Sequence, residues 1–297
     1  MKEQIEMQEN HIGTLFKNLR KNKKMSLNDV SGDLISLSFI SKFERGESEI
    51  SLSRFLILLN NLNVTIEEFH NLYQYEYPGE VEDLMIKVST YFSNKDISGF
   101  EKTQTEEKER YEATGKRRYL YNSIMLKAFI SDFTNTPMNK EDITILTDFL
   151  FGTEYWGKYE LLLLGNSMPS IQVDSLDLLL KELIKNSEKV TTTEANYILK
   201  IDLLLNAIHN AFKRKRVDYA QEYIEYIETI MVSSVKLIYG KVLLDFYKAI
   251  IRMIKNNDEE AKEEITSIFK ALQTLSLESI AKTMEKDYEY ILEIYNI

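Results

Sequence analysis

The chain contains very few of the residues that make turns. Only 10 glycines and 3 prolines, at Pro78, Pro137 and Pro169, occur in 297 residues. A sheet protein needs a turn after every short strand, and turns draw heavily on glycine and proline because of the backbone angles they require. This scarcity favours long helices joined by short polar connections. The sequence therefore predicts an all-α fold.

The rest of the composition indicates a folded protein without cysteine chemistry. Hydrophobic residues make up 44% of the chain and charged residues 28%, enough for a sizeable core and about two domains. The absence of cysteine excludes disulfides, thiolate zinc sites and thiol catalysis. The first ten residues are acidic and polar, unlike a signal peptide, and no apolar run is long enough to span a membrane. We therefore expect a soluble cytoplasmic protein with no metal and no cofactor.

Charge is distributed unevenly along the chain. Residues 10–66 carry eight Lys or Arg and five Asp or Glu, while the whole chain has a net charge of −10. A mildly basic segment is therefore attached to a strongly acidic remainder. This asymmetry is typical of a nucleic-acid-binding module joined to a body that phosphate repels.

Five short helices are predicted between residues 8 and 77. Ile12, Leu15, Phe16 and Leu19 have helical spacing in the first. Local capping signals mark where later helices begin, because a Ser or Thr side chain can accept a hydrogen bond from a free amide of the first turn. The expected starts are Ser26 with Asp29 for the second helix, Ser36 for the third, Ser51 for the fourth, and Thr65 with Glu68 for the fifth.

The apolar residues of the third and fourth helices indicate which of their faces point inward. Gly46 is expected to end the third helix, as a glycine after a helix often does. In the third helix Ile40 and Phe43 fall on one face, and Phe39 is also assigned to the core. The fourth helix is expected to turn four residues inward, Leu52, Phe55, Leu56 and Leu59.

The order of these features resembles the Xre/Cro family of five-helix repressor domains. The shared features are LR and KNKK in the first helix, Ser26 before the second, IS-x-x-ERG in the third, and a closing L-x-V-T-x-E-E-F. One residue is missing from the turn before the third helix. The resemblance implies a helix-turn-helix whose third helix lies in the major groove of DNA.

Carried onto this chain, the resemblance implies two groups of DNA contacts. The third helix would present to the bases Ser36, Leu37, Ser38, Ser41 and Lys42. Phosphate contacts, which position the protein and make binding salt-dependent, would come from Lys17, Arg20, Lys24 and Arg45. Glu44 is expected to pair with a basic neighbour inside the domain instead of touching DNA.

A second domain is expected after the Pro78-Gly79 break. We place the helix-turn-helix domain at residues 1–77 and a helical sensor and dimerisation domain at residues 78–297. Further helices are predicted at residues 81–93, 97–113, 117–133, 140–153, 156–166, 173–186, 193–213, 217–231, 234–256, 258–273 and 276–295. Aromatic-rich helix pairs recur at intervals of about 35–40 residues, a spacing typical of a tetratricopeptide-like solenoid. Such a solenoid has a concave face suited to an extended peptide.

Three segments of this second domain resemble the Rgg/MutR family of regulators. They are WGKYELLLLGN at 156–166, YGKVLLDFYKAIIRMIKNNDEEAKEEI at 239–265 and LESIAKTMEKDYEYIL at 277–292. The N-terminal SFISKFERGESEISLSRF also matches, so that the resemblance covers nearly the whole chain. It implies a homodimer that binds an inverted-repeat promoter site and responds to a short signalling peptide, as in quorum sensing.

The resemblance also points to peptide-binding residues. Asn offers both a donor and an acceptor and can hold a peptide unit regardless of its side chain. Asn166 occupies the motif position that implies such a contact, although it could also simply cap a helix. Asn206 and Asn210, one turn apart, are candidates for the same inner face. Trp156 and Tyr159 complete the predicted site, more as scaffold than as ligand contacts.

Other functions have weaker support in the sequence. The basic run at residues 213–216 is expected to be solvated, with an acidic peptide as the alternative partner. The three histidines, His11, His70 and His209, share no catalytic motif, and no phosphate-binding loop or nucleophile elbow occurs, so that an enzyme is not expected. Two alternatives stay open: a protein-interaction adaptor built on helical repeats, and an Xre-type regulator that responds to a non-peptide ligand.

Overall fold

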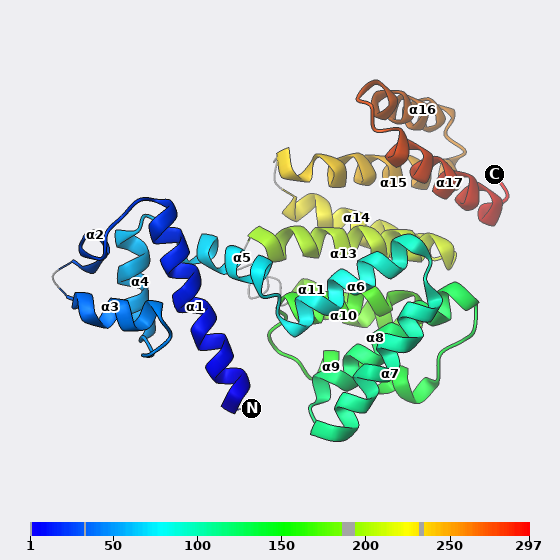
Figure 1. Cartoon of the computed structure of the whole chain (residues 1–297). Coiled ribbons are helices and arrows are strands. Elements are labelled where there is room, and N and C mark those ends of the chain that lie inside the picture. The colour runs from blue at the N-terminus through cyan, green and yellow to red at the C-terminus, as the bar shows by residue number, and fades with distance from the viewer. Residues whose placement is uncertain (1, 33, 186–193, 232–234) are drawn as a thin grey trace. The chain divides into compact units, whose positions relative to one another are not determined.

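The computed structural model describes residues 2–32, 34–185, 194–231 and 235–297, and it contains helices and no strand in those ranges (Figure 1). The predicted all-α fold is confirmed. The chain divides into two compact units, Met1–Ser89 and Thr90–Ile297. The first contains α1 (Lys2–Asn22), α2 (Leu27–Ser31), α3 (Leu37–Glu44), α4 (Leu52–Asn61), α5 (Ile66–Glu76) and most of α6 (Glu80–Asn94).

The helices of the first unit begin at the predicted caps. Ser26 and Asp29 form a reciprocal capping box at α2, and Thr65 and Glu68 form another at α5. Ser51 accepts a hydrogen bond from the amide of Arg54 at the start of α4. Each of these bonds joins residues three apart, so the boundaries are set by local sequence.

Four phenylalanines form the centre of the first unit. Phe16, Phe43, Phe55 and Phe69 come from α1, α3, α4 and α5, and the rings in contact have centroids 4.9–6.4 Å apart. Edge-to-face contacts such as that between Phe55 and Phe69 are favourable for aromatic rings. This cluster fixes the orientation of α3, because Phe43 lies on its inner face.

Gly13 allows α1 and α3 to approach each other closely. A Cβ atom at this position would lie 2.0 Å from the carbonyl oxygen of Phe43. Glycine inside a helix costs roughly 1 kcal/mol relative to alanine, so this one is retained for the space it leaves. The close approach also fixes the depth at which α3 is seated.

The predicted inward face of α4 is partly wrong. Phe55 and Leu59 are buried as expected, but Leu52 and Leu56 are exposed. Leu58 takes the inward place instead. The sequence of α4 contains two overlapping apolar stripes, one with Leu52 and Leu56 and one with Leu58. Packing in the core selects the stripe that includes Leu58, so α4 turns that side inward.

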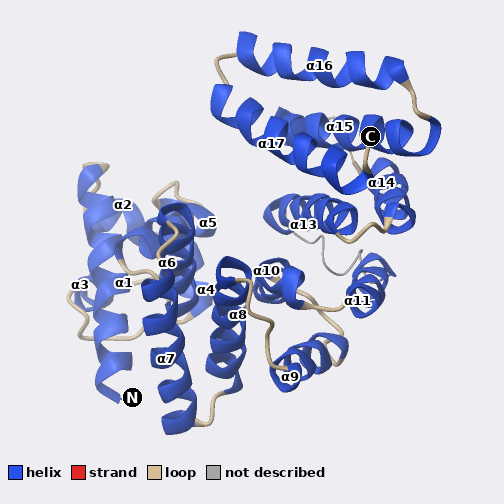
Figure 2. Cartoon of the chain, turned by 90° about the vertical axis from the view of Figure 1, so that its right-hand side faces the viewer, coloured by secondary structure: helices blue, strands red, loops and turns tan. Residues whose placement is uncertain are grey.

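The second unit is a stack of helix pairs. Figure 2 shows them following one another from α7 and α8 at one end to α15, α16 and α17 at the other. The helices are α7 (Ile97–Thr114), α8 (Arg117–Thr134), α9 (Lys140–Phe151), α10 (Lys158–Ser167), α11 (Val173–Lys185), α13 (Glu194–Lys213), α14 (Val217–Ile230), α15 (Ile238–Asn256), α16 (Glu259–Thr274) and α17 (Glu278–Tyr295), with short 3-10 turns η1 (Met168–Ser170) and η2 (Val235–Leu237). This agrees closely with the predicted segments.

Asparagine replaces glycine at several helix ends of the second unit. Asn135, Asn257 and Asn296 end α8, α15 and α17 with φ angles of 52–55°, in the left-handed region. Asn tolerates this conformation better than other non-glycine residues because its short polar side chain can bond locally. These caps explain how so many helices can end in a chain with so little glycine.

The division between the units does not coincide with the Pro78-Gly79 break. That break does separate α5 from α6, but the first compact unit continues to Ser89 within α6. The domain boundary at Tyr77 therefore stays a prediction from sequence.

Candidate DNA-binding and ligand-binding sites

The first turn of α3 presents both polar and apolar side chains to solvent. The Ser36 hydroxyl caps the helix by accepting a hydrogen bond from the amide of Phe39 at 3.3 Å, and it lies 3.3 Å from Ser38 Oγ. Leu37 is exposed between them, while Ile40 is buried in the core. This arrangement leaves one face of α3 open to a DNA groove while the other anchors it.

The second turn of α3 carries the cations. Lys42 is exposed and makes no ion pair within the part of the chain that the structure describes. Arg45 donates to Ser41 Oγ at 2.5 Å and to both oxygens of Glu47 at 2.6 Å. Lys42 is therefore free to reach a base or phosphate, whereas Arg45 must exchange Glu47 for phosphate.

A row of polar residues follows one face of α13 in the second unit. Asp202, Asn206, His209 and Lys213 are spaced four, three and four residues apart, so they lie on one side of the helix. Three of them are exposed and His209 is half-buried. We call these four residues the α13 polar row.

Side chains from α15 and α17 lie near this row. His209 Nε2 is 4.0 Å from the Asp287 carboxylate, and Lys213 Nζ is 5.8 Å from the ring centroid of Tyr290. Burial lowers the pKa of His209 and Asp287 opposes that shift. Burial, followed by the charges of Asp287 and Asp202, raises the pKa of Tyr239 on α15. Three helices thus bring titratable groups to one polar surface.

Asn166 lies near the end of α10, which packs against α13. Its amide Nδ2 is 3.5 Å from the sulfur of Met125, and the side chain is half-buried. The preceding Gly165 lies close to α13, since a Cβ there would meet Leu203 at 3.9 Å. Asn166 and the α13 polar row therefore belong to adjoining helices.

Comparison with known families decides the identity of the chain. A model of the C-terminal domain of the HTH-type transcriptional regulator Rgg matches residues 100–286, and a helix-turn-helix model matches residues 16–69. The chain belongs to the Rgg family. It is therefore a DNA-binding transcription regulator and not an enzyme.

Solved structures agree with this assignment. The SHP pheromone receptor Rgg2 of Streptococcus dysgalactiae is 28% identical, with a TM-score of 0.78 over 94% of this chain and 99% of that chain. A transcriptional regulator from Listeria monocytogenes EGD-e (19% identity, TM-score 0.82, 97% and 99% covered) and the PrgX/cCF10 complex (17% identity, TM-score 0.75, 95% and 92% covered) share the fold.

The structure corrects the assignment of Arg20 to DNA phosphate. Its side chain is 9% exposed and its guanidinium donates to both oxygens of Glu44, at 2.6 and 2.7 Å, and to the Met25 carbonyl oxygen at 2.7 Å. The predicted pairing of Glu44 with a basic neighbour is confirmed. A regulator of this family thus uses Arg20 to join α1 to α3, and the phosphate contacts of Lys17 and Lys24 stay predictions.

Arg54 is a candidate phosphate contact that sequence reasoning missed. It lies in the first turn of α4, is exposed, and its guanidinium carbon is 5.3 Å from the ring centroid of Phe39. Phe39 packs against the core but stays half-buried, and Arg54 covers part of its ring. The missed signal was a cation just after the N-cap of α4, which brings it beside α3.

Two of the predicted peptide contacts are scaffold residues. Trp156 is fully buried and its indole N–H donates to the Thr153 carbonyl oxygen at 3.0 Å. The Tyr159 hydroxyl lies 3.0 Å from Asn122 Oδ1 and 3.1 Å from the Arg118 carbonyl oxygen, two acceptors for its one proton. Burial raises the pKa of Tyr159. Both side chains hold α10 in place and leave Asn166 as the accessible member of the motif.

Asn206 and Asn210 do not share one environment. Asn206 is exposed in the α13 polar row. Asn210 is 8% exposed, and its Oδ1 has no hydrogen-bond partner among the described residues. One helical turn therefore separates a side chain that a ligand can reach from one that it cannot reach without rearrangement.

The prediction that the basic run at residues 213–216 is solvated is wrong for Arg214, and Arg216 is engaged in ion pairs at the surface. Arg214 donates to the carbonyl oxygens of Ile171, Pro169 and Met168 at 2.5, 2.7 and 3.3 Å. Arg216 pairs with Asp174 at 3.0 Å and with Asp218 at 2.8 Å, and it lies over the Tyr219 ring at 3.6 Å. Both side chains tie the α13–α14 turn to neighbouring helices.

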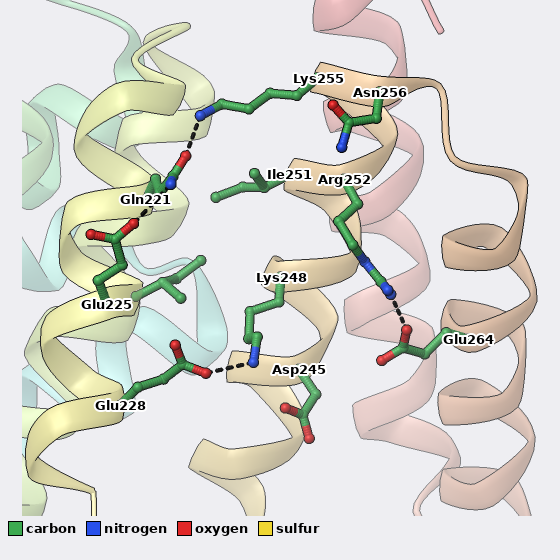
Figure 3. A pocket seen from close by; sticks show the side chains of 11 residues that line it. Gln221, Glu225, Glu228, Asp245, Lys248, Ile251, Arg252, Lys255, Asn256 and Glu264 are labelled. Carbon is green, nitrogen blue, oxygen red and sulfur yellow. Dashed lines mark hydrogen bonds and ion pairs between the residues drawn. The ribbon is translucent and has the colours of Figure 1, made fainter.

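A pocket of about 440 Å³ lies between α14 and α15 (Figure 3). Its charged walls are paired with each other: Lys248 with Glu228 at 2.5 Å, Lys255 with Gln221, and Arg252 with Glu264. Because these charged groups already have partners, the pocket is a weaker candidate for binding a charged ligand than the α13 polar row.

Other kinds of site receive no support in the described residues. None of the described helices is both long and apolar enough to cross a membrane. No group of three or more metal-ligating side chains comes together in the described ranges.

Proposed function

We propose that the chain is a homodimeric regulator whose binding to promoter DNA is controlled by a short peptide. The peptide would lie along α10 and the α13 polar row. The observation that carries this proposal is the row itself, a set of amide, charged and imidazole groups on α13, the helix against which the α10 helix of Asn166 packs. The 28% identity with a pheromone receptor supports a peptide as the ligand.

The chemistry of the row suits an extended peptide. Backbone N–H and C=O groups need partners when they are buried, and an amide side chain can supply both. Asn166 and Asn206 would hold peptide units, while Asp202 and Lys213 would meet charges at side chains or termini. Trp156 and Tyr159 would hold α10 in place without touching the peptide. The buried Asn210 would contact the peptide only after a rearrangement.

The DNA side of the proposal uses two copies of α3. A symmetric dimer places two reading helices in successive major grooves about 34 Å apart, so the operator is an inverted repeat. Ser36, Leu37, Ser38 and Lys42 would face the bases, with Ser41 beside them. The DNA phosphates would be contacted by Lys17, Lys24, Arg45 and Arg54. The protein would act in the cytoplasm, where the DNA lies.

Control by the peptide would be a population shift. A ligand changes an equilibrium only by its difference in affinity for the two states. The polar row lies on α13, His209 and Lys213 in it face side chains of α17, and the charge of Asp202 acts on Tyr239 of α15, so a peptide there would favour one packing of these helices. That packing would set the spacing of the two DNA-reading helices in the dimer.

Fluorescence polarisation with labelled peptides tests this function. The probes are the peptides encoded by short reading frames beside the gene. Asn166→Ala and Asn206→Ala are each expected to weaken binding roughly fivefold, the effect of one lost hydrogen bond. Asn256→Ala, an exposed asparagine at the end of α15, is the matched control and should bind normally.

Two results would overturn the proposal. One is the absence of saturable binding by any of these peptides at high micromolar concentration. The other is equal affinity of the full chain for promoter and random duplexes, which an adaptor protein would show. Sedimentation of the free chain tests the dimer separately.

A further inference from the structure

Two exposed leucines lie on either side of the cap of α3. Leu34 precedes Ser36 and is 74% exposed, and Leu37 follows it and is 44% exposed. Full burial of a leucine side chain stabilises a folded protein or a complex by roughly 1.5–3 kcal/mol. Most of this free energy is still available to a binding partner at Leu34 and Leu37. The position is the end of α3 that enters the groove in a helix-turn-helix protein.

The surrounding sequence restricts how α3 can read bases. Residues 34–42, LISLSFISK, include no Arg, Asn, Gln, Asp or Glu. Paired hydrogen bonds to adenine use Asn or Gln, and those to guanine use Arg or Lys. Lys42 is therefore the one long polar side chain of this segment, and the serine hydroxyls discriminate weakly among bases.

The remaining distinctive feature of a base edge is the thymine methyl group. It projects into the major groove and is recognised by apolar contact. Leu34 and Leu37 offer such contacts at the N-terminal end of α3. Lys42 on the same helix and Arg54 over the ring of Phe39 are both exposed, and their charge favours a phosphate-lined groove over an apolar protein partner.

We propose that Leu34 and Leu37 determine operator sequence by contacting thymine methyl groups in the major groove. The inference rests on DNA binding through α3 and not on the peptide. Each half-site would contain one or two thymines whose methyl groups these leucines cover. Removing one covered methyl corresponds to a loss of roughly fourfold in affinity.

Deoxyuridine substitution tests this directly. The full-length chain first selects its preferred duplexes from a random pool. Each thymine of the selected site is then replaced by deoxyuridine, which keeps the hydrogen-bonding edge and lacks only the methyl group. We expect roughly fourfold weaker binding at one or two positions in each half-site and no change elsewhere.

A double-mutant cycle assigns the methyl contacts to residues. Leu37→Ala and Leu34→Ala should each bind the thymine and deoxyuridine duplexes equally at one position. Leu72→Ala, a control on α5 with 40% exposure, should keep the discrimination. Alanine suits the helical positions 37 and 72, Leu34 lies in the turn before α3, and circular dichroism tests whether all three variants are folded.

The proposal is overturned if the chain binds its selected duplex tightly but is indifferent to every deoxyuridine, or if Leu34→Ala and Leu37→Ala both retain full discrimination. Selection of half-sites without thymine would also overturn it. None of these outcomes affects peptide binding, so failure here is distinct from failure of peptide control.

Discussion

The two units of the chain each contain a basic run, and each run includes an arginine that serves the fold. In the first unit Arg20 donates to the carboxylate of Glu44 across 24 residues of sequence. In the second, Arg214 donates to three main-chain carbonyl oxygens. No carboxylate pairs with Arg214 in the part of the chain that the structure describes.

The difference is visible in the acid–base behaviour of the two side chains. Hydrogen bonding to Glu44 raises the pKa of Arg20, whereas burial lowers the pKa of Arg214. Arg20 thus depends on one oppositely charged partner. Arg214 depends on the conformation of a segment, the 3-10 turn that follows the end of α10. An arginine in a basic run can therefore be structural in two ways, and each responds differently to mutation.

The largest expected effect is at the buried ion pair. Glu44→Gln leaves the Arg20 charge buried without its partner, which costs about 3–5 kcal/mol. The first unit should lose most of its stability, and DNA binding should be lost with it. Differential scanning calorimetry of the full chain, in which the two units are followed as separate transitions, measures the loss.

The control for this pair is a double replacement. Arg20→Met with Glu44→Leu removes both charges and should recover much of the stability, because no unpaired charge remains. Lys21→Met, at an exposed neighbour, should change little. A Glu44→Gln protein with unchanged melting would show that the ion pair does not hold α1 to α3.

Arg214→Met is expected to have a smaller effect. Three carbonyl oxygens lose a charged donor, but each can recover some hydration at the surface, so the cost is about 1–3 kcal/mol. Arg214→Lys should restore only part of this, because an ammonium group cannot reproduce the planar fork. Thermal unfolding of the second unit measures both changes.

Second-site behaviour separates the two arginines. No single replacement should rescue Arg214→Met, since its acceptors are main-chain atoms. Lys215→Met, at an exposed position of the same turn, is the control. Glu44→Leu is expected to restore the stability lost in Arg20→Met. If replacing a single Asp or Glu also restored the stability lost in Arg214→Met, the contrast between the two arginines would be wrong.

Much of the fold could be predicted from sequence because helix ends depend on local bonds. The caps at Ser26, Ser36, Ser51 and Thr65 all join residues three apart. The inward face of α4 was harder. The stripes that include Leu52 or Leu58 overlap, and only packing against other helices distinguishes them.

The sites could be predicted only in part, because their contacts join distant residues. Glu44 was assigned a basic partner, but nothing local identified Arg20 as that partner instead of a phosphate contact. Arg214 meets Ile171 across 43 residues. The nearness of His209 to Asp287 likewise follows from the packing of α13 against α17, which periodicity does not specify.

A pH measurement extends the comparison to a group in the second unit. Burial lowers the pKa of His209 from 6.5, against the opposing charge of Asp287 and assisted by Lys213. The unfolded chain then binds a proton more readily, so stability should fall as pH drops through about 6.5. The slope contributed by one group is at most about 1.4 kcal/mol per pH unit.

His209→Gln should flatten this part of the profile for the second unit and leave the first unit unchanged. Melting temperatures of both units between pH 8 and about 5.5 measure the difference. Asp287→Asn should make the dependence steeper, because it removes the charge that favours protonation. An identical pH profile in His209→Gln and the parent protein would contradict the assignment.

The smallest stability effect is expected at a third arginine, Arg45, whose partner Glu47 is also exposed. Exposed ion pairs are worth about 0–1 kcal/mol, so Arg45→Ala should barely change melting. DNA binding should still weaken, with the slope of log K against log salt falling by about 1 if one phosphate contact is lost. Filter binding at several salt concentrations measures this, with Lys116→Ala in the second unit as the control. An unchanged slope would mean that Arg45 keeps its bond to Glu47 when the protein binds DNA, so that this exposed arginine, like Arg20 and Arg214, serves the fold.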